Sequence, residues 1–368
     1  MNISKNIYLK NFQQKKPNRK LLKLFTYLIA EKKQIILSLS KNYENSYTKK
    51  FLLKFKKFQK IKLIGMGGSV LGAKSIYSFL KHKIKKKCVF VDNLNLENFS
   101  KKEDKNNLNL IISKSGNTLE TITNVNFFFN KKQKNIFVTD NKKNYLKSLA
   151  KKLKSDVVSH NNFIGGRYSV LSEVGMLPAD LMGLDPLKFR QFNNLIKNKS
   201  FINNLISNVS NIIDLVNKKK TNSVILNYDE KALDLFYWYQ QLVAESLGKN
   251  GKGIFPIISN MPKDNHSLMQ LYLSGPKNNF YTFFFVKESL SAKINKVKFA
   301  QFNATQNIFK KKNIPFRTLI VKNRREETLG ELFIFFILET ILLGRAMKIN
   351  PFDQPAVEMI KDETKKFL

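Results

Sequence analysis

Residues 61–80 read IKLIGMGGSVLGAKSIYSFL, a short apolar run that passes through a glycine-rich turn into a helical pattern. The run Ile61–Gly65 is apolar and ends at a glycine, which predicts a buried strand. In Val70–Leu80 apolar residues recur at helical spacing, so we expect a helix directly after the turn. A strand followed by a covering helix is the repeating unit of parallel α/β sheets.

The same alternation continues along the rest of the chain. Further strands are predicted at Cys88–Asp92, Leu108–Ser113, Asn135–Thr139, Asp156–Ser159, Ser223–Asn227, Gly253–Ile257, Tyr281–Val286 and Phe316–Val321. Helical patterns between several of them cover Thr118–Phe129, Tyr145–Lys154, Ala232–Ser246, Lys296–Phe309 and Leu329–Met347. The expected fold class is therefore α/β, with two doubly wound parallel sheets, each in an α/β/α sandwich, and helical termini.

The chain has 368 residues, which is enough for two domains. A polar helical stretch between Asp185 and Asn222 separates the two series of predicted strands. We expect a helical N-terminal segment at 1–50, α/β domains at 51–190 and 191–350, and a C-terminal helix at 351–368.

The formal net charge of +38 raises the question of a nucleic-acid partner. The basic residues are 58 Lys and 7 Arg, scattered along the whole length. Bases are usually read by arginine forks and clustered patches, so a chain-wide lysine bias is favoured and no nucleic acid is expected. A nucleic-acid binder is the alternative, and it predicts steeply salt-dependent binding to duplexes.

Two features bear on the cellular compartment. Cys88 is the single cysteine, so no disulfide can form within the chain, as is usual in a reducing compartment. No apolar segment of a secretory signal follows the charged start. The run Leu329–Met347 approaches membrane-spanning length, but Glu331, Glu339 and Arg345 within it favour a buried helix. We expect a cytoplasmic protein without a membrane anchor.

Two glycine-containing turns follow predicted strands. Residues 65–72 read GMGGSVLG, and free N–H groups at such a helix start attract phosphate. A tight structural turn is the alternative, because neither the P-loop ending nor the third glycine of a dinucleotide motif is present. Residues 113–121 read SKSGNTLET, with hydroxyls, a lysine and a glycine that suit a phosphate dianion. Here helix capping is the alternative.

Three further segments carry candidate catalytic groups. Arg167 follows two glycines in GGRYSVLS (165–172), where a fixed cation could stabilise a developing anion or form a surface ion pair. In QLVAESLGK (241–249), Gln241 and Glu245 share one helical face. Glu245 is a candidate general base, although a solvated glutamate at a helix end is common. His266, in DNHS (264–267), can pass protons near neutral pH or simply begin a helix.

Near the C-terminus, residues 350–361 read NPFDQPAVEMIK, in which Pro355 suits the first turn of a final helix. Lys361 lies on that helix seven residues after Gln354. No cluster of Cys and His with metal-ligand spacing occurs, so no metal is expected.

These segments, in this order, resemble the glucose-6-phosphate isomerase (phosphoglucose isomerase) family from Ile64 to Lys361. The most specific matches are SKSGNTLET, GGRYSVLS, QLVAESLGK and FDQPAVEMIK. The first also resembles the wider class of sugar-isomerase (SIS) domains. The resemblance implies tandem SIS-type sandwiches and reversible conversion of D-glucose 6-phosphate to D-fructose 6-phosphate through a cis-enediol, as in glycolysis and gluconeogenesis.

The resemblance also implies the role of each residue. Glu245 would be the base, Arg167 would stabilise the enediolate, His266 would open the sugar ring and Lys361 would assist at the ring oxygen. It implies a homodimer with shared active sites, in which the partner subunit supplies His266, and no cofactor. The substrate-binding residues implied are Gly68, Ser69, Ser113, Lys114, Ser115, Thr118, Gln241 and Gln354.

The chain departs from the family pattern in a few places. It is shorter than most members, which puts the dimer in question. Ser115, Tyr168 and Ala356 replace the usual threonine, phenylalanine and glycine, and none of these changes removes a group that the reaction needs. Two alternatives are kept: an isomerase of mannose or amino sugar phosphates, and a sugar-phosphate sensor that binds without turnover.

Overall fold

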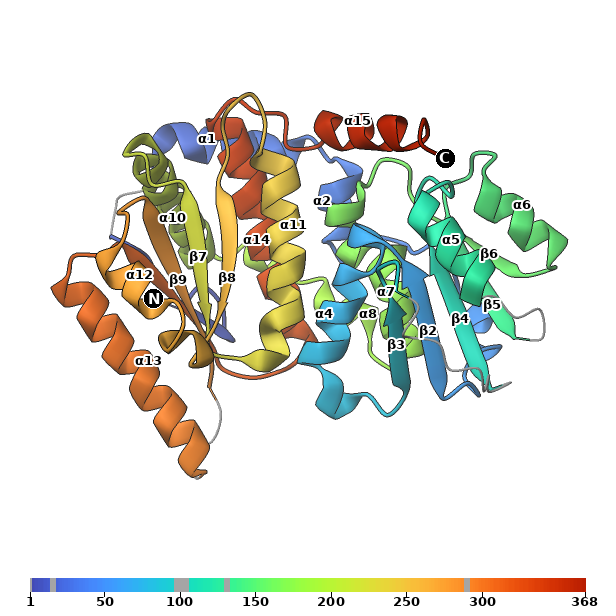
Figure 1. Cartoon of the computed structure of the whole chain (residues 1–368), viewed down its shortest axis with the longest axis horizontal. Helices are drawn as coiled ribbons and strands as arrows, with labels where there is room; N and C mark the ends of the chain where they lie inside the picture. The colour runs from blue at the N-terminus through green and yellow to red at the C-terminus, as the bar shows by residue number, and fades with distance from the viewer. Residues whose placement is uncertain (1, 14–17, 96–105, 129–132, 288–291) are drawn as a thin grey trace.

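The computed structural model describes residues 2–13, 18–95, 106–128, 133–287 and 292–368. Within these residues the strands form two sheets of five strands each, which lie side by side with helices between and around them (Figure 1). The α/β architecture with two mainly parallel sheets is confirmed.

The first sheet has the order β3-β2-β4-β5-β6, and all its neighbouring strands are parallel. The middle strand β4 (Asn107–Ile112) is buried at every position, as expected for a strand covered by helices on both faces. The other elements of this unit are β2 (Lys60–Gly65), η1 (Gly67–Ser69), α4 (Leu71–Phe79), η2 (Lys81–Lys83), β3 (Lys87–Val91), α5 (Leu119–Phe128), β5 (Lys134–Thr139), α6 (Tyr145–Lys152) and β6 (Asp156–Ser159).

The second sheet has the order β1-β10-β9-β7-β8, with four parallel strands and one antiparallel edge strand. Each predicted strand of the second series is present, with bounds that differ from the prediction by up to three residues. The elements are β7 (Asn222–Asn227), η4 (Glu230–Ala232), α11 (Leu233–Leu247), β8 (Phe255–Asn260), η5 (Lys263–Asn265), α12 (Met269–Ser274), β9 (Asn279–Val286), α13 (Lys293–Lys311), β10 (Phe316–Val321) and α14 (Glu326–Ala346).

The antiparallel edge strand β1 (Ile7–Lys10) corrects the prediction that residues 1–50 form a helical segment. It pairs with β10, with Ile7 opposite Val321 and Lys10 opposite Thr318. Ile7 and Leu9 are buried. This period of two places alternate side chains on the core face of the sheet. Helices follow in the rest of the segment, namely α1 (Arg19–Ala30), α2 (Gln34–Ser38) and α3 (Lys49–Leu53).

A run of helices connects the two sheets in sequence and in space. It comprises η3 (Gly166–Leu171), α7 (Glu173–Leu181), α8 (Pro186–Phe189), α9 (Phe192–Leu195) and α10 (Lys199–Asn217). Between the sheets, α11 packs against both α4 and α14. One hydrophobic cluster includes Ile76 on α4, Leu242 on α11 and Ile337 on α14. The two sheets therefore share a continuous core.

Two helices near the C-terminus differ sharply in burial. α14 is buried along most of its length, in agreement with the prediction of a buried helix. None of the helices in the described part of the chain is long and apolar enough to span a bilayer. In contrast, every residue of α15 (Pro355–Thr364) is exposed. Figure 1 shows α15 lying over the edge of the first sheet at which its strands end.

Candidate active site

Parallel strands place two of the predicted turns next to each other. β2 and β4 are neighbours in the first sheet, so their carboxyl ends meet at one edge. The glycine turn that contains Gly67 and Gly68 follows β2, and the turn Ser113–Thr118 follows β4. The carboxyl edge of an open α/β sheet is where ligands usually bind. Packing of α11 against α4 brings the end of α11, and with it Glu245, to the same edge.

Gly68 allows two loops to touch at this edge. A Cβ atom at this position would lie 2.2 Å from the carbonyl carbon of Gly166 and 2.6 Å from the main-chain nitrogen of Arg167. Only a residue without a side chain permits this approach. The neighbouring Gly67 has a φ of +54°, and a Cβ there would lie 2.9 Å from Nε2 of Gln241. The glycine turn is thus fitted closely to the segment that carries Arg167 and to Gln241 on α11.

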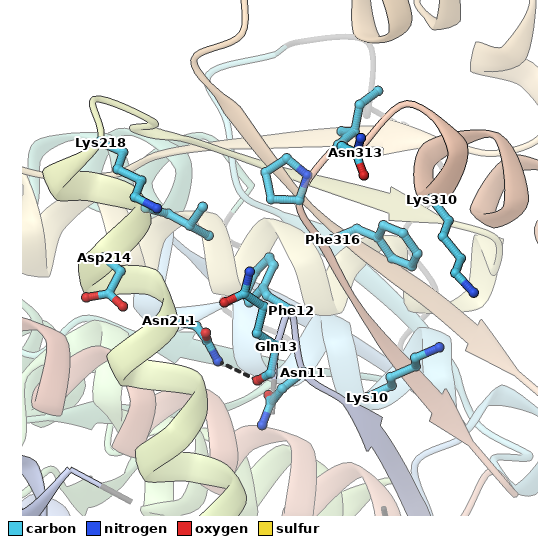
Figure 2. Close-up of a pocket in the computed structure, with 13 residues that line it drawn as sticks. Lys10, Asn11, Phe12, Gln13, Asn211, Asp214, Lys218, Lys310, Asn313 and Phe316 are labelled. Atoms are coloured by element: carbon cyan, nitrogen blue, oxygen red, sulfur yellow. Dashed lines mark hydrogen bonds between the residues drawn. The ribbon is translucent and has the colours of Figure 1, made fainter. Parts of the chain in front are cut away.

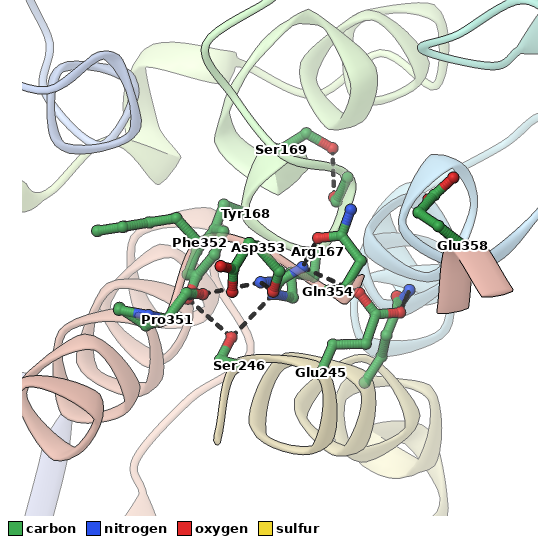
Figure 3. A network of polar contacts seen from close by, with 12 residues as sticks. Arg167, Tyr168, Ser169, Glu245, Ser246, Pro351, Phe352, Asp353, Gln354 and Glu358 are labelled. Carbon is green, nitrogen blue, oxygen red and sulfur yellow. Dashed lines mark hydrogen bonds and ion pairs between the residues drawn. The ribbon is translucent and has the colours of Figure 1, made fainter. Parts of the chain in front are cut away.

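Arg167 lies at the centre of the site and is almost completely buried, at 2% exposed (Figure 3). Its Nε donates to Oγ of Ser246 at 2.8 Å. Nη1 donates to Oε2 of Glu245 at 3.1 Å and to Oε1 of Gln354 at 2.8 Å. Nη2 donates to the main-chain oxygens of Pro351 at 2.8 Å and Asp353 at 3.0 Å. All five N–H groups of the guanidinium therefore have acceptors, which fixes its plane.

Glu245 is held by both of its oxygens but stays open to solvent. Oε2 accepts from Arg167, and Oε1 accepts from Nε2 of Gln241 at 2.7 Å. The side chain is 26% exposed, so one side of the carboxylate can be reached by a ligand. The Gln241–Glu245 bond confirms that these residues share a helical face. The buried Oε1 of Gln241 has no hydrogen-bond partner among the described residues.

The turn Ser113–Thr118 gathers hydroxyl groups at the start of α5. Oγ of Ser113 lies 2.9 Å from Oγ1 of Thr118, and Oγ of Ser115 lies 3.5 Å from the same atom. Gly116 has a φ of +64°, and a Cβ there would lie 2.0 Å from Oδ1 of Asn144. Asn144 also caps the amino end of α6, so the turn packs directly against the start of that helix.

Lys114 projects from this turn in a partly buried position. Burial lowers the pKa of its ammonium group, and the nearby carboxylate of Asp140 partly opposes this effect. The turn therefore offers a lysine, three hydroxyls and the amino end of a helix to a single ligand.

The structure brings most of the predicted site residues together, but not all. Ser69 is half-buried in η1, beside Gly68. Lys361 on α15 is 54% exposed and its Nζ lies 2.7 Å from Oε1 of Glu358. In this conformation it pairs with its own helix, and no contact joins it to Glu245.

His266 lies at the opposite edge of the second sheet from Glu245. β7 and β8 are parallel and α11 connects them, so Glu245, near the end of α11, lies at the amino edge of β8. His266 follows the carboxyl end of β8, directly after η5, and is exposed. Within one chain the two residues are therefore separated by the length of the strand.

Sequence reasoning gave no role to Ser246, Pro351 or Asp353, and it gave none to the hydroxyl of Tyr168. The first three accept hydrogen bonds from Arg167, and the Tyr168 oxygen lies 2.8 Å from Oγ of Ser246. Each of these residues stands within a few positions of a predicted site residue, and this closeness in the sequence was the only indication that they belong to the site.

Two cavities lie apart from this site. One, of about 390 Å³, is bounded by β1, α10, α13 and β10, and Figure 2 shows the lysine side chains of Lys10, Lys218 and Lys310 around it. The other, of about 620 Å³, lies near the end of β6 beside Tyr43 and His160. Neither contains a predicted site residue. Among the described residues, no group of three or more His, Cys, Asp and Glu side chains could hold a metal ion.

Comparison with known proteins places this geometry in context. Residues 50–255 match the family described as phosphoglucose isomerase. A glucose-6-phosphate isomerase from Methanocaldococcus jannaschii is 33% identical over 336 residues, which cover 82% of this chain and 82% of that protein.

Two crystal structures show the same fold. A hypothetical protein from Thermus thermophilus superposes with a TM-score of 0.79 at 20% identity, over 94% of each chain. A glucose-6-phosphate isomerase from Chlamydia trachomatis superposes with a TM-score of 0.72 at 21% identity, over 91% of this chain and 72% of that one.

Proposed function

The chain belongs to the phosphoglucose isomerase family, and from that premise we propose how its residues divide the work of the reaction. The chain catalyses the reversible conversion of D-glucose 6-phosphate to D-fructose 6-phosphate. The observation that carries the mechanism is the placement of Glu245, which is exposed on one side and held on the other by Arg167 and Gln241.

Glu245 is the base that moves the proton between the two carbons. In the open-chain aldose its carboxylate takes the proton from C2, and the C–H electron pair forms a double bond to C1. The carbonyl oxygen gains the negative charge and is protonated to give a cis-enediol. The same carboxyl group then returns the proton to C1, and the C2 hydroxyl becomes the carbonyl by releasing a proton, which balances the one that the first oxygen took up. One base fixed beside both carbons suits this sequence.

Arg167 keeps the charge balanced during these steps. Before reaction its cation is paired with the Glu245 carboxylate at 3.1 Å. When Glu245 takes the proton, the negative charge passes to the substrate oxygen, and Nη1 of the same guanidinium is next to it. The buried position of Arg167 strengthens this interaction and excludes water.

The turn after β4 binds the phosphate. Ser113, Ser115 and Thr118 provide hydroxyl donors and Lys114 a cation, at the amino end of α5. Phosphate binding away from the reacting carbons orients the sugar chain along the sheet edge towards Glu245. Gly68 and Ser69 line the path between the turn and the base. Gln241 and Gln354 offer amide groups to the sugar hydroxyls, and the unpaired Oε1 of Gln241 suits a hydroxyl donor.

Ring opening requires two further groups, His266 and Lys361. His266 can act only if a second copy of the chain supplies it, because its own Glu245 lies at the other edge of the sheet. The working unit is accordingly a homodimer with shared sites, acting in the cytoplasm on a sugar phosphate. Lys361 reaches the ring oxygen after a shift of α15, whose side chains are all exposed.

Replacement of Glu245 by glutamine tests the base. In a coupled assay that converts fructose 6-phosphate, Glu245→Gln should lower kcat by at least about 100-fold, because the amide cannot accept the C2 proton. The control is Glu230→Gln, which removes an exposed carboxylate from η4. Turnover in deuterated water should place deuterium on the product with the unaltered chain and with Glu230→Gln, but not with Glu245→Gln. Normal turnover by Glu245→Gln would refute this assignment.

A further inference from the structure

The guanidinium of Arg167 is part of a closed ring of hydrogen bonds with Ser246, Tyr168 and Pro351 (Figure 3). Nε of Arg167 donates to Oγ of Ser246, and the oxygens of Ser246 and Tyr168 are 2.8 Å apart. The Tyr168 hydroxyl donates to the main-chain oxygen of Pro351 at 2.8 Å. The same oxygen accepts from Nη2 of Arg167, also at 2.8 Å, which completes the ring.

Every proton of this ring can be assigned. The carbonyl of Pro351 only accepts, so the single hydroxyl proton of Tyr168 is committed to it. Ser246 must then donate its own proton to the Tyr168 oxygen, and its Oγ accepts from Nε of Arg167. The ring residues are buried, and burial raises the pKa of Tyr168, so the phenol stays protonated. Both arms of the ring therefore run from the guanidinium to the Pro351 oxygen, and a fully satisfied buried network of this kind is rigid.

The ring holds two of the three guanidinium nitrogens. Nε and Nη2 are fixed by Ser246 and Pro351, and Nη1 is the nitrogen that faces Glu245. We propose that the Tyr168 hydroxyl is a positioning group that acts through Ser246 to aim Nη1 of Arg167 at the oxygen on which the enediolate charge forms. The inference rests on the proposed function, and it assigns to this chain a use for the hydroxyl that phenylalanine lacks.

A positioning role and a merely structural role make different predictions. A structural hydroxyl would affect stability and all ligands alike. A group that aims Nη1 affects only species with negative charge at the reacting carbons. Two ligands separate these cases. Glucitol 6-phosphate carries a phosphate and neutral hydroxyls, whereas arabinonate 5-phosphate carries a carboxylate where the enediolate charge would lie.

The experiment compares Tyr168→Phe with the unaltered chain by calorimetry and by the coupled assay. We expect affinity for the arabinonate to fall about tenfold and kcat to fall by a similar factor, because a misaligned guanidinium loses the anion. Affinity for the glucitol phosphate and KM should stay within about twofold. Ser246→Ala breaks the same ring at its other hydroxyl, and the double variant should be no worse than either single variant.

The matched control is Tyr43→Phe, which removes another hydroxyl donor, 2.8 Å from Oε2 of Glu173, outside the site. It should lower the thermal midpoint without changing arabinonate affinity. The inference is overturned if Tyr168→Phe weakens both ligands equally or neither, if its effect adds to that of Ser246→Ala, or if Tyr43→Phe acts in the same way. Absence of turnover in the unaltered chain would count against the proposed function alone, because the binding comparison still tests the ring.

Discussion

Arg167 shows how a single side chain can join segments that are far apart in sequence. Its acceptors are side chains on α11, the side chain of Gln354, and two main-chain oxygens of the loop 350–354. Ser246 follows Glu245 directly, so α11 points one residue at the open side of the site and the next at the buried ring. Neighbouring positions on a helix face different directions, which lets the base and its support share one turn.

Gly68 should not tolerate even a methyl group. In Gly68→Ala the added Cβ would meet the carbonyl carbon of Gly166 at 2.2 Å, so the loop that carries Arg167 must move. We expect the free energy of unfolding in urea to fall by about 1–3 kcal/mol. We also expect kcat to fall by more than this loss of stability explains, because Arg167 moves with its loop. Gly165→Ala is the control, because its φ is −69° and its Cβ would have only an ordinary contact at 3.8 Å. Equal behaviour of the two variants would contradict the close approach.

Asp180 should make stability depend on pH in a direction opposite to that of most carboxylates. Burial raises its pKa from an ordinary value of 3.8 to about 6, although the Tyr47 hydroxyl donates to it at 2.7 Å. Because the folded pKa lies above the unfolded one, ionisation destabilises the fold as pH rises from about 4 to 6. Asp180→Asn, which keeps an acceptor for Tyr47, should therefore raise the thermal midpoint at pH 8.

The same comparison at lower pH provides the control for Asp180. Below the unfolded pKa of 3.8 both chains carry a neutral side chain, so the gain should disappear. Thermal melts at pH 3 and pH 8 would show this convergence. A gain that is constant with pH would mean that hydrogen bonding, and not ionisation, explains the effect.

At the scale of elements, α14 contains a carboxylate that forms an ion pair deep in the core. Glu339 is fully buried and forms an ion pair with both terminal nitrogens of Arg317 on β10. Nε of Arg317 donates to Oγ1 of Thr282 at 2.9 Å, and Nη1 donates to Oδ1 of Asn208 at 2.9 Å. The apolar run that approaches membrane-spanning length is thus a buried helix, and the ion pair of Glu339 with Arg317 joins it to β10 of the second sheet.

Removing the Glu339 charge should be costly. Glu339→Gln leaves the Arg317 cation buried without its counterion, and we expect a loss of about 3–5 kcal/mol in urea unfolding. The control on the same helix is Glu331→Gln. Glu331 is hydrogen-bonded to Ser4 at 2.6 Å, and burial raises its pKa, so loss of its charge should matter much less. Similar losses in both variants would show that the ion pair itself contributes little.

The elements that the sequence predicted well are those with a local signal. β2 and α4 follow from an apolar run, a glycine turn and helical spacing within residues 61–80, and the turn Ser113–Thr118 follows from its own composition. β1 could not be predicted, because so short a strand carries little periodicity and its partner β10 lies near the other end of the chain. The ring of Tyr168, Ser246 and Pro351 was missed for the same reason, since its members meet only after both sheets have formed.

At the scale of the whole molecule, the two sheets contribute different edges to one site. The first sheet offers its carboxyl edge, with the turns after β2 and β4. The second offers its amino edge, where α11 ends with Glu245. Its own carboxyl edge carries His266, which lies at the opposite end of the strands from Glu245. In the proposed mechanism one chain therefore holds the proposed base, the arginine and the phosphate turn together, and the proposed ring-opening histidine would come from a second copy.

Shared sites make a specific prediction for mixtures of inactive variants. Glu245→Gln and His266→Ala should each be nearly inactive on the ring form of the substrate, since each lacks one group at every site. When the two chains are refolded together, half of the dimers are mixed, and one of their two sites combines an intact Glu245 with an intact His266. About a quarter of the unaltered activity should then return. Each variant refolded alone is the control. Mixtures that stay as inactive as their parts would mean that His266 does not cross between subunits.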